Sequence, residues 1–359
     1  MKKKFVSIML CLSMTAFMLT GCSTEKTPKD ETNDVSNNAA EEITQGAVSD
    51  EDVSKTWDGL TFKVIPMNTA SDYWLALKAG AEAAAEELGS KYGGITIEFD
   101  GPQSNADINK QLSILENAVT AKLDGVLIAA LNPETFSEPI QNAIDSGVPV
   151  ITVDDGVEPN TALSFIATDN YAATKLLGEY ISELAGGKGK FAMIANSTAH
   201  SSDIDRPQGF QDGMEGKGDW ECVGKQLAYG DIQKAESMAL NFMQSNPDIN
   251  VMFASNDRGS IGVCNAFIQL GIKDNVKLCS VDITKDTLQY MRDGYLSAAV
   301  LQRPYDMGYQ GVEALLKHLE GGELEKVVDT GVFLLTPDKL GTEEATEAIQ
   351  QYMPDYKGE

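Results

Sequence analysis

The sequence predicts an α/β protein built of two doubly wound, Rossmann-like lobes with parallel sheets. From about residue 60 onward, short β-branched runs alternate with segments of helical period. This alternation starts a second time after about residue 168, which indicates two successive sets of β and α elements. The run Gly125 to Ala130 is apolar without interruption, as expected of a parallel strand covered on both faces.

The predicted elements follow in order. In the first set, the strands are 62–65, 95–99, 125–130 and 148–153, and the helices are 73–88, 108–119 and about 136–144. In the second set, the strands are 190–195, 221–227, 251–254 and 276–281, and the helices are 170–185, 206–215, 232–245 and 259–270. Beyond Gln302 we expect a helix over 306–319, a strand over 327–335 and a last helix.

The N-terminus has the pattern of an export signal. Lys2, Lys3 and Lys4 precede an uncharged apolar run, 5–19, which is too short to span a bilayer stably. The run ends in Leu19-Thr20-Gly21-Cys22, which resembles the lipobox of bacterial lipoproteins. That resemblance implies cleavage of a signal peptide, residues 1–21, and lipidation of Cys22. The alternative is an ordinary signal peptide with an incidental cysteine.

A change in composition follows Cys22. Residues 23–56 are rich in Thr, Asn, Ser, Asp and Glu and show no periodicity, so we expect residues 22–57 to form a disordered acidic tether behind the lipidated cysteine. No later segment is long and apolar enough for a transmembrane helix. The predicted location is therefore outside the cytoplasm, anchored by lipid to the cell membrane.

Composition excludes several classes of function. The chain has 54 acidic and 28 basic residues and no basic patch, which argues against nucleic-acid binding. Cys222, Cys264 and Cys279 are too widely spaced for a disulfide framework or a zinc motif, and His200 and His318 lack a second metal ligand at suitable spacing. With no phosphate loop and no nucleophile–base order, we expect no cofactor, no metal and no enzymatic activity.

Polar side chains follow the predicted strands, where ligands bind in open α/β sheets. They are amides, carboxylates and hydroxyls, with two aromatic residues beside them: 68–72, Tyr73, Trp74, Asn132, Asp154, Asp155, 196–205, Asn256, Asp257, Asp282 and Gln302. Such groups satisfy the hydroxyls of a sugar, and aromatic rings cover its C–H face.

The same positions carry a family likeness. The blocks that carry it are Ser71-Asp72-Tyr73-Trp74, Asp124-Gly125-Val126 with Leu131-Asn132-Pro133, 149–154, 206–210, Ser255-Asn256-Asp257, Val281-Asp282 and Leu301-Gln302-Arg303-Pro304. Through these blocks the chain, from about Leu60 to the end, resembles the ribose- and galactose-type periplasmic binding proteins of ABC importers, which have the type I fold.

The resemblance implies two lobes joined by three hinge crossings, with lobe 1 formed by 58–167 plus 303–329 and lobe 2 by 168–302 plus 330–359. It also implies capture of a small sugar or polyol and delivery to the permease subunits of an ABC transporter. The expected ligand-binding residues are Ser71, Tyr73, Trp74, Asn132, Asp154, Asp155, Asn256, Asp282 and Gln302.

Two departures from the ribose-type pattern concern charge. Val153-Asp154-Asp155 places a second acid where ribose binders have an arginine, as arabinose-type binders do. The position of a further ligand-contacting arginine falls on Ile204, or, with a shift in the alignment, on Asp203 or Asp205. Arg206 is then the nearest cation, with an expected structural role. These departures predict an unusually acidic pocket, which also suits a cationic ligand.

Each candidate has a structural alternative. Tyr73 and Trp74 could belong to the core, Asn132-Pro133 could be a turn, and Asp257 and Asp282 could cap helices.

Three other functions compete with import. A subunit that senses a ligand for a membrane receptor or sensor kinase uses the same closing lobes. A secreted glycosidase using Asp154 and Asp155 has poor geometry, because adjacent residues of an extended segment point to opposite faces. A sugar-repressor type of regulator conflicts with the export signal and the lack of a helix-turn-helix. Pentoses, hexoses, polyols and the furanosyl signal autoinducer-2 all fit the predicted pocket chemistry.

Overall fold

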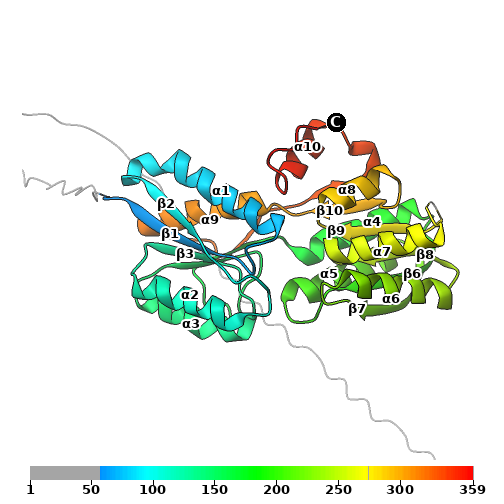
Figure 1. The fold of residues 1–359 in the computed structure, drawn as a ribbon, viewed down its shortest axis with the longest axis horizontal. Coiled ribbons are helices and arrows are strands. Elements are labelled where there is room, and N and C mark those ends of the chain that lie inside the picture. The colour runs from blue at the N-terminus through cyan, green and yellow to red at the C-terminus, as the bar shows by residue number, and fades with distance from the viewer. Residues whose placement is uncertain (1–56, 274, 359) are drawn as a thin grey trace, which may run out of the picture. The chain divides into compact units, whose positions relative to one another are not determined.

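The computed structural model describes residues 57–273 and 275–358. Two six-stranded sheets, each with helices on both faces, form a first and a second lobe (Figure 1). The predicted signal peptide, Cys22 and nearly all of the predicted tether lie outside the described residues.

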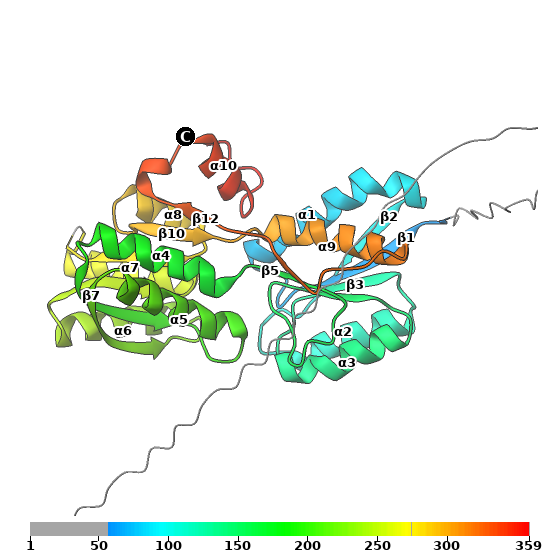
Figure 2. The ribbon, with the colours of Figure 1, turned by 180° about the vertical axis from the view of Figure 1, so that it is seen from behind.

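The first sheet has the strand order β11-β5-β4-β3-β1-β2, and all of its pairings are parallel. Its strands are β1 (Leu60–Ile65), β2 (Ile95–Phe99), β3 (Gly125–Ile128), β4 (Val150–Val153), β5 (Phe165–Ala167) and β11 (Val327–Asp329). Its helices are α1 (Asp72–Leu88), α2 (Ile108–Thr120), α3 (Pro133–Asp145) and α9 (Pro304–Leu319), with a 3₁₀ turn, η1 (Gly89–Tyr92). Helices α1 and α9 cover one face of this sheet, and α2 and α3 cover the other (Figure 2).

The second sheet repeats this plan with the order β12-β10-β9-β8-β6-β7. Its strands are β6 (Lys188–Ala195), β7 (Asp219–Leu227), β8 (Ile249–Ala254), β9 (Lys277–Val281), β10 (Ala298–Leu301) and β12 (Phe333–Leu335), of which only β12 is antiparallel to its neighbour. Its helices are α4 (Asn170–Leu184), α5 (Ser201–Gly216), α6 (Ile232–Ser245), α7 (Asp257–Leu270), α8 (Lys285–Arg292) and α10 (Glu343–Gln350), with a 3₁₀ turn, η2 (Pro337–Lys339).

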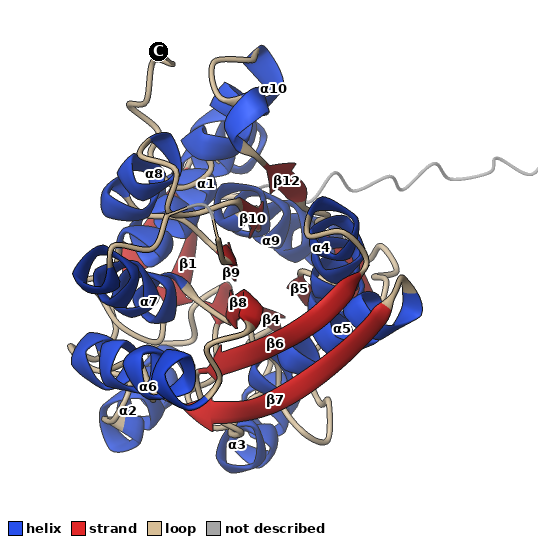
Figure 3. Cartoon of the chain, turned by 90° about the vertical axis from the view of Figure 1, so that its right-hand side faces the viewer, coloured by secondary structure: helices blue, strands red, loops and turns tan. Residues whose placement is uncertain are grey.

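Alternate residues of the second sheet divide the core of this lobe in two. Phe191 and Met193 of β6 join the apolar cluster under α4 and α5, whereas Ala192 and Ile194 join the cluster on the other face. Figure 3 shows β6 and β7 between these two layers of helices. Both faces of the sheet are covered, which explains why its strands read as continuous apolar runs.

Three chain crossings join the lobes, because β5 leads into α4, β10 leads into α9, and β11 leads into β12. The prediction of two doubly wound lobes is therefore confirmed. The single strand predicted over 327–335 is wrong: β11 and β12 belong to different sheets, and Gly331, with a φ of 72°, interrupts the run between them.

Three short elements and one helix boundary also differ from the sequence prediction. The sequence does not predict the strands β5 and β10 or the helix α8, since runs of three, four and eight residues give little periodicity. Helix α5 begins at Ser201 instead of residue 206, so Pro207 lies inside the helix. The free thiols Cys264 and Cys279 are buried, as expected.

Candidate functional site

Asp154 and Asp282 occupy equivalent places in the two lobes. Each directly follows the strand that is fourth along the chain in its lobe, which is β4 in the first lobe and β9 in the second. Each has a left-handed backbone, with φ of 64° and 66°, and donates its N–H to the neighbouring strand, at Ile166 and Val300. Aspartate tolerates this conformation better than most residues. The fold thereby places one carboxylate directly after a central strand of each sheet.

Tyr73 of α1 contacts the first of these carboxylates. Its hydroxyl donates to Asp154 Oδ1 at 2.5 Å, and its ring packs against both lobes, with the Tyr352 ring centroid 5.9 Å away. Burial, followed by the charge of Asp155, raises the pKa of Asp154 to about 7. At neutral pH, the Asp154 carboxyl is therefore close to the midpoint of its titration.

The second acid of the pair, Asp155, is buried and connects the lobes. Ser202 of α5 donates to Asp155 Oδ1 at 2.9 Å. Burial is the largest cause of the raised pKa of Asp155, and the charges of His200 and Arg206 oppose it. Asp155 therefore accepts a neutral hydroxyl from the second lobe and lies near its basic groups.

On the second lobe, Asp282 lies in a network of donors. Gln302 Nε2 lies 2.9 and 3.2 Å from the two carboxylate oxygens, and the Tyr352 hydroxyl donates to Oδ1 at 2.6 Å. Arg206 Nη1 lies 4.0 Å from Oδ2. The backbone N–H of Gln302 donates to the oxygen of the Tyr352 hydroxyl at 2.6 Å. The hydroxyl therefore accepts from Gln302 and donates its own proton to Asp282.

His200, directly before α5, forms a further link between the lobes. Its Nε2 lies 3.1 Å from the carbonyl oxygen of Leu131, and its Nδ1 lies 3.5 Å from Asp203 Oδ2. Burial by itself lowers the pKa of His200, but the hydrogen bond with Asp203 and the nearby carboxylates raise it to about 9. Asp257, at the start of α7, interacts electrostatically with Asp282 and Arg206. We name the following residues the interlobe cluster: Tyr73, Asp154, Asp155, His200, Ser202, Asp203, Arg206, Asp257, Asp282, Gln302 and Tyr352.

Five predicted site residues therefore belong to the interlobe cluster: Tyr73, Asp154, Asp155, Asp282 and Gln302. Asn132 and Asn256 stand at strand ends as expected, but both side chains cap helices, accepting from the N–H of Thr135 and Gly259 at 2.8 Å. Asp257 and Asp282 are not N-caps, since Asn256 caps α7 and Thr284 caps α8.

Ser71 precedes α1 and forms no capping bond through its side chain. Trp74 is only 5% exposed and belongs to the apolar core of the first lobe. Its packing therefore agrees with the alternative that Trp74 is a core residue.

The sequence misses other members of the cluster or gives them a different role. It includes His200, Ser202 and Asp203 only within the polar segment 196–205. It gives Arg206 a structural role, which fits its bonds to Asn170 and the backbone of Ser255, and Arg206 also lies 4.0 Å from Asp282. The spacing of His200, Ser202 and Arg206 becomes informative only when α5 is known to begin at Ser201. Tyr352 has no sequence signal, because only the return of the chain end places it beside Asp282.

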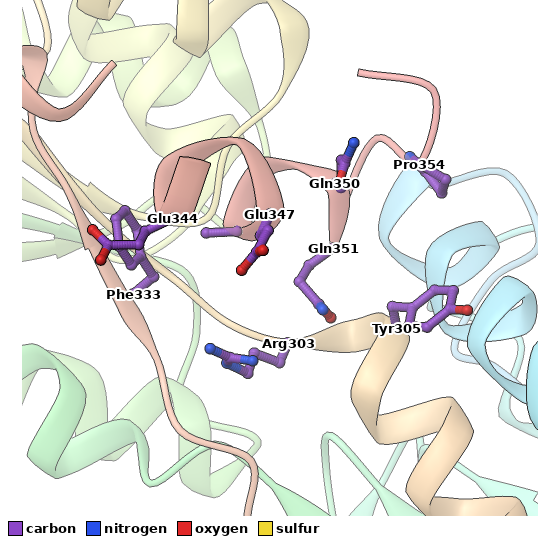
Figure 4. Close-up of a pocket in the computed structure, with 9 residues that line it drawn as sticks. Arg303, Tyr305, Phe333, Glu344, Glu347, Gln350, Gln351 and Pro354 are labelled. Carbon is purple, nitrogen blue, oxygen red and sulfur yellow. The ribbon is translucent and has the colours of Figure 1, made fainter. Parts of the chain in front are cut away.

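A separate pocket of about 690 Å³ lies beside α10 (Figure 4). It is lined by Arg303, Tyr305, Phe333, Glu344, Glu347, Ala348, Gln350, Gln351 and Pro354, none of which belongs to the predicted site. Within the described residues, no helix is long and apolar enough to cross a membrane.

Residues 62–323 match a family described as periplasmic binding protein domain, and the chain belongs to this family. The ribose import binding protein RbsB of Bacillus subtilis is 29% identical over 93% of this chain and 99% of its own length. RbsB of Escherichia coli is 28% identical over 74% of this chain and 86% of its own.

Solved structures give the same result. The glucose-galactose binding protein GanP of Geobacillus stearothermophilus aligns with a TM-score of 0.73 at 28% identity, covering 79% of this chain and 99% of GanP. A carbohydrate transporter solute binding protein of Agrobacterium radiobacter, in complex with D-arabinose, aligns with a TM-score of 0.73 at 30% identity, covering 81% and 98%. The two lobes and their three crossings are thus the type I fold of periplasmic sugar-binding proteins.

Proposed function

We propose that this chain captures a small sugar or sugar-like polyol between its two lobes and delivers it unaltered to an ABC import permease. The observation that carries the proposal is the interlobe cluster, in which polar side chains at the strand ends of both lobes meet. The relatives support it, since they are named for ribose import and the aligned structures for sugar binding.

The chemistry of the cluster suits a polyhydroxylated solute. Asp154, Asp155 and Asp282 accept from hydroxyls, and charge-assisted bonds of this kind are stronger than neutral ones. Tyr73 offers a ring to a C–H face. Of the remaining predicted contacts, Ser71, Asn132, Asn256 and Gln302 would supply neutral polar groups. Trp74 would act behind Tyr73, whose ring it meets edge-on at 5.1 Å.

The proposed lobes are 58–167 plus 303–329 and 168–302 plus 330–359, as the sequence predicts. The test is a thermal-shift screen of the purified protein against pentoses, hexoses and polyols. A sugar that raises the melting temperature, and is recovered chemically unchanged after prolonged incubation, supports the proposal. Stabilisation by other solutes but by no sugar or polyol would contradict it, as would enzymatic turnover of the bound sugar.

We also propose that a lipid on Cys22 anchors the protein to the cell membrane. After removal of residues 1–21, a diacylated Cys22 would hold the protein on the outer side of the cell membrane, near the permease. Expressed with its own signal in a Gram-positive host, the protein should sediment with membranes, and Cys22→Ala should release it to the medium. A substitution of Ser23 to Ala is the matched control and should remain bound. Membrane retention of the Cys22→Ala protein would contradict lipidation at this residue.

A further inference from the structure

The interlobe cluster contains more acidic groups than its basic groups can balance. Five carboxyl groups interact electrostatically with the single guanidinium of Arg206, namely those of Asp154, Asp155, Asp203, Asp257 and Asp282. Among the described residues, the other basic group of the cluster is His200, which pairs with Asp203 and whose charge also lowers the pKa of Asp155. Arg258, outside the cluster, acts in the same direction on Asp257. The five carboxyl groups of the cluster therefore outnumber its two basic groups.

Two of these carboxyl groups have only neutral donors. Asp154 accepts the hydroxyl of Tyr73, and Asp155 accepts the hydroxyl of Ser202. Within the described residues, no lysine, arginine or histidine forms an ion pair with either carboxylate. Two adjacent buried acids without a direct ion pair are costly, because burial penalises each charge and each charge penalises the other. The charges of Arg206 and, for Asp155, of His200 oppose this cost without removing it, since the pKa of both acids stays raised.

A second observation concerns hydrogen-bond acceptors. Gln302 is 2% exposed, and its amide nitrogen is used by Asp282, but its carbonyl oxygen Oε1 is buried without a donor. A buried acceptor of this kind costs free energy unless a partner supplies a proton. Because Asp282 joins Gln302 to the cluster, the unpaired acceptor belongs to the same site as the acid pair.

Two of the five N–H donors of Arg206 are committed. Its Nε donates to Asn170 Oδ1 at 2.7 Å and its Nη1 to the carbonyl oxygen of Ser255 at 3.2 Å. The hydroxyl of Tyr352 already donates to Asp282. Apart from the remaining N–H groups of Arg206, the donors described above are in use, whereas the acceptor Gln302 Oε1 has no donor. A neutral sugar hydroxyl supplies one donor, whereas an ammonium group supplies three donors, no acceptor and one positive charge.

We infer that the solute of this site is a cationic sugar, an amino sugar or amino polyol, whose ammonium group binds at Asp154 and Asp155. Its hydroxyls pair with Asp282 and with Gln302 Oε1. This inference rests on the proposed function and narrows it to a class of ligand. The described residues contain no group of three or more His, Cys, Asp or Glu side chains that could hold a metal ion.

The test compares matched sugars by isothermal titration calorimetry at pH 7.5. Each amine is paired with its neutral parent sugar or polyol; the amines are glucosamine, galactosamine, mannosamine and 1-amino-1-deoxyglucitol. The N-acetyl forms of the hexosamines are further controls, since they carry an uncharged group on the same carbon atom. We expect at least one amine to bind at least tenfold more tightly than its neutral parent. Binding of 1-amino-1-deoxyglucitol, whose amine is already protonated at pH 7.5, should also release protons, measured in two buffers of different ionisation enthalpy, because the ammonium group favours the charged form of Asp154.

Two variants locate the ammonium group. Asp155→Asn should reduce the preference of the amine over its parent at least fivefold, whereas Asp145→Asn, the same change at an exposed end of α3, should leave it unchanged. Tight binding of a neutral sugar, equal to or above that of its amine, would overturn the inference and leave the proposed function intact. A panel in which no amine binds would also overturn it. Binding of a solute that is neither sugar nor polyol would instead overturn the proposed function.

Discussion

The residues of the site differ in how far the sequence predicts them. Asp154, Asp155 and Asp282 follow apolar strands, and the rule that ligands bind at strand ends identifies them directly. Their partners do not follow from that rule. The Tyr352 hydroxyl meets Asp282 across 70 positions, and Ser202 meets Asp155 across 47. The first pair depends on how the end of the chain returns to the second lobe, and the second pair on how the two lobes face each other. Local sequence patterns encode neither.

Asp154 should make the stability of the ligand-free protein depend on pH. Burial raises its pKa to about 7, so the folded protein holds this proton more tightly than the unfolded chain does. The resulting stabilisation is complete below about pH 4 and is lost as the pH rises to about 7. His200, with a pKa raised to about 9, should extend the loss from about pH 6.5 to 9.

We expect Asp154→Asn to remove the share of Asp154 in this loss, whereas Asp257, whose pKa burial raises to about 6, keeps its own share. Asparagine keeps an acceptor for Tyr73 and tolerates the left-handed backbone, but it carries no charge. The free energy of unfolding at pH 7.5 should rise by about 1–3 kcal/mol relative to the wild type, and the difference should disappear near pH 4. Urea denaturation across this range measures it, with Asp145→Asn as the surface control. An unchanged pH slope in Asp154→Asn would show that this carboxyl is not the titrating group.

At the scale of elements, both lobes use glycines to bring two helices into close contact. In the first lobe, a Cβ at Gly308 of α9 would lie 2.0 Å from the carbonyl oxygen of Leu77 in α1. In the second lobe, a Cβ at Gly209 of α5 would lie 2.2 Å from that of Tyr171 in α4. The periodicity predicts these helices but not their pairing, because a glycine on an apolar face does not identify its neighbour. This packing fixes α5, which carries Ser202, Asp203 and Arg206 into the cluster.

We therefore expect Gly209→Ala to destabilise the protein by about 1–3 kcal/mol, because its Cβ overlaps backbone that cannot move without separating the two helices. At Gly216, the end of the same helix, an added Cβ would have no neighbouring atom within 4 Å, so Gly216→Ala should stay within about 1 kcal/mol of the wild type. Chemical denaturation of both variants decides the matter. Equal stability of the two variants would exclude close packing of α4 and α5 at Gly209.

The whole molecule repeats one strand order in two lobes, and this repetition is what the sequence predicts best. Each set of alternating strand and helix patterns in the sequence predicts one lobe. The end of the chain is different: α10 and the residues after it pack on the second lobe, and Gln351 Nε2 donates to Asp306 Oδ1 of α9 at 3.1 Å. The C-terminal segment therefore contacts a helix of the first lobe and supplies Tyr352 to the cluster. No motif marks it, because its position follows from the third crossing and not from its own pattern.

The last prediction concerns closure of the lobes around a ligand. A ligand that contacts Asp154 and Asp155 on one lobe and Asp282 on the other binds the closed form better than the open one, and only this difference in affinity can shift the equilibrium.

Ser202→Ala removes a direct hydrogen bond between the lobes, so the closed form should lose about 1–3 kcal/mol. Small-angle scattering should show a smaller radius of gyration on saturation with the ligand from the thermal-shift screen, and Ser202→Ala should need roughly 5- to 100-fold more ligand for the same change. Ser113→Ala, which alters an exposed serine of α2, should behave as the wild type does. Unchanged dimensions of the wild-type protein at saturation would refute ligand-driven closure, whereas equal midpoints for the two variants would show that Ser202 does not stabilise the closed form.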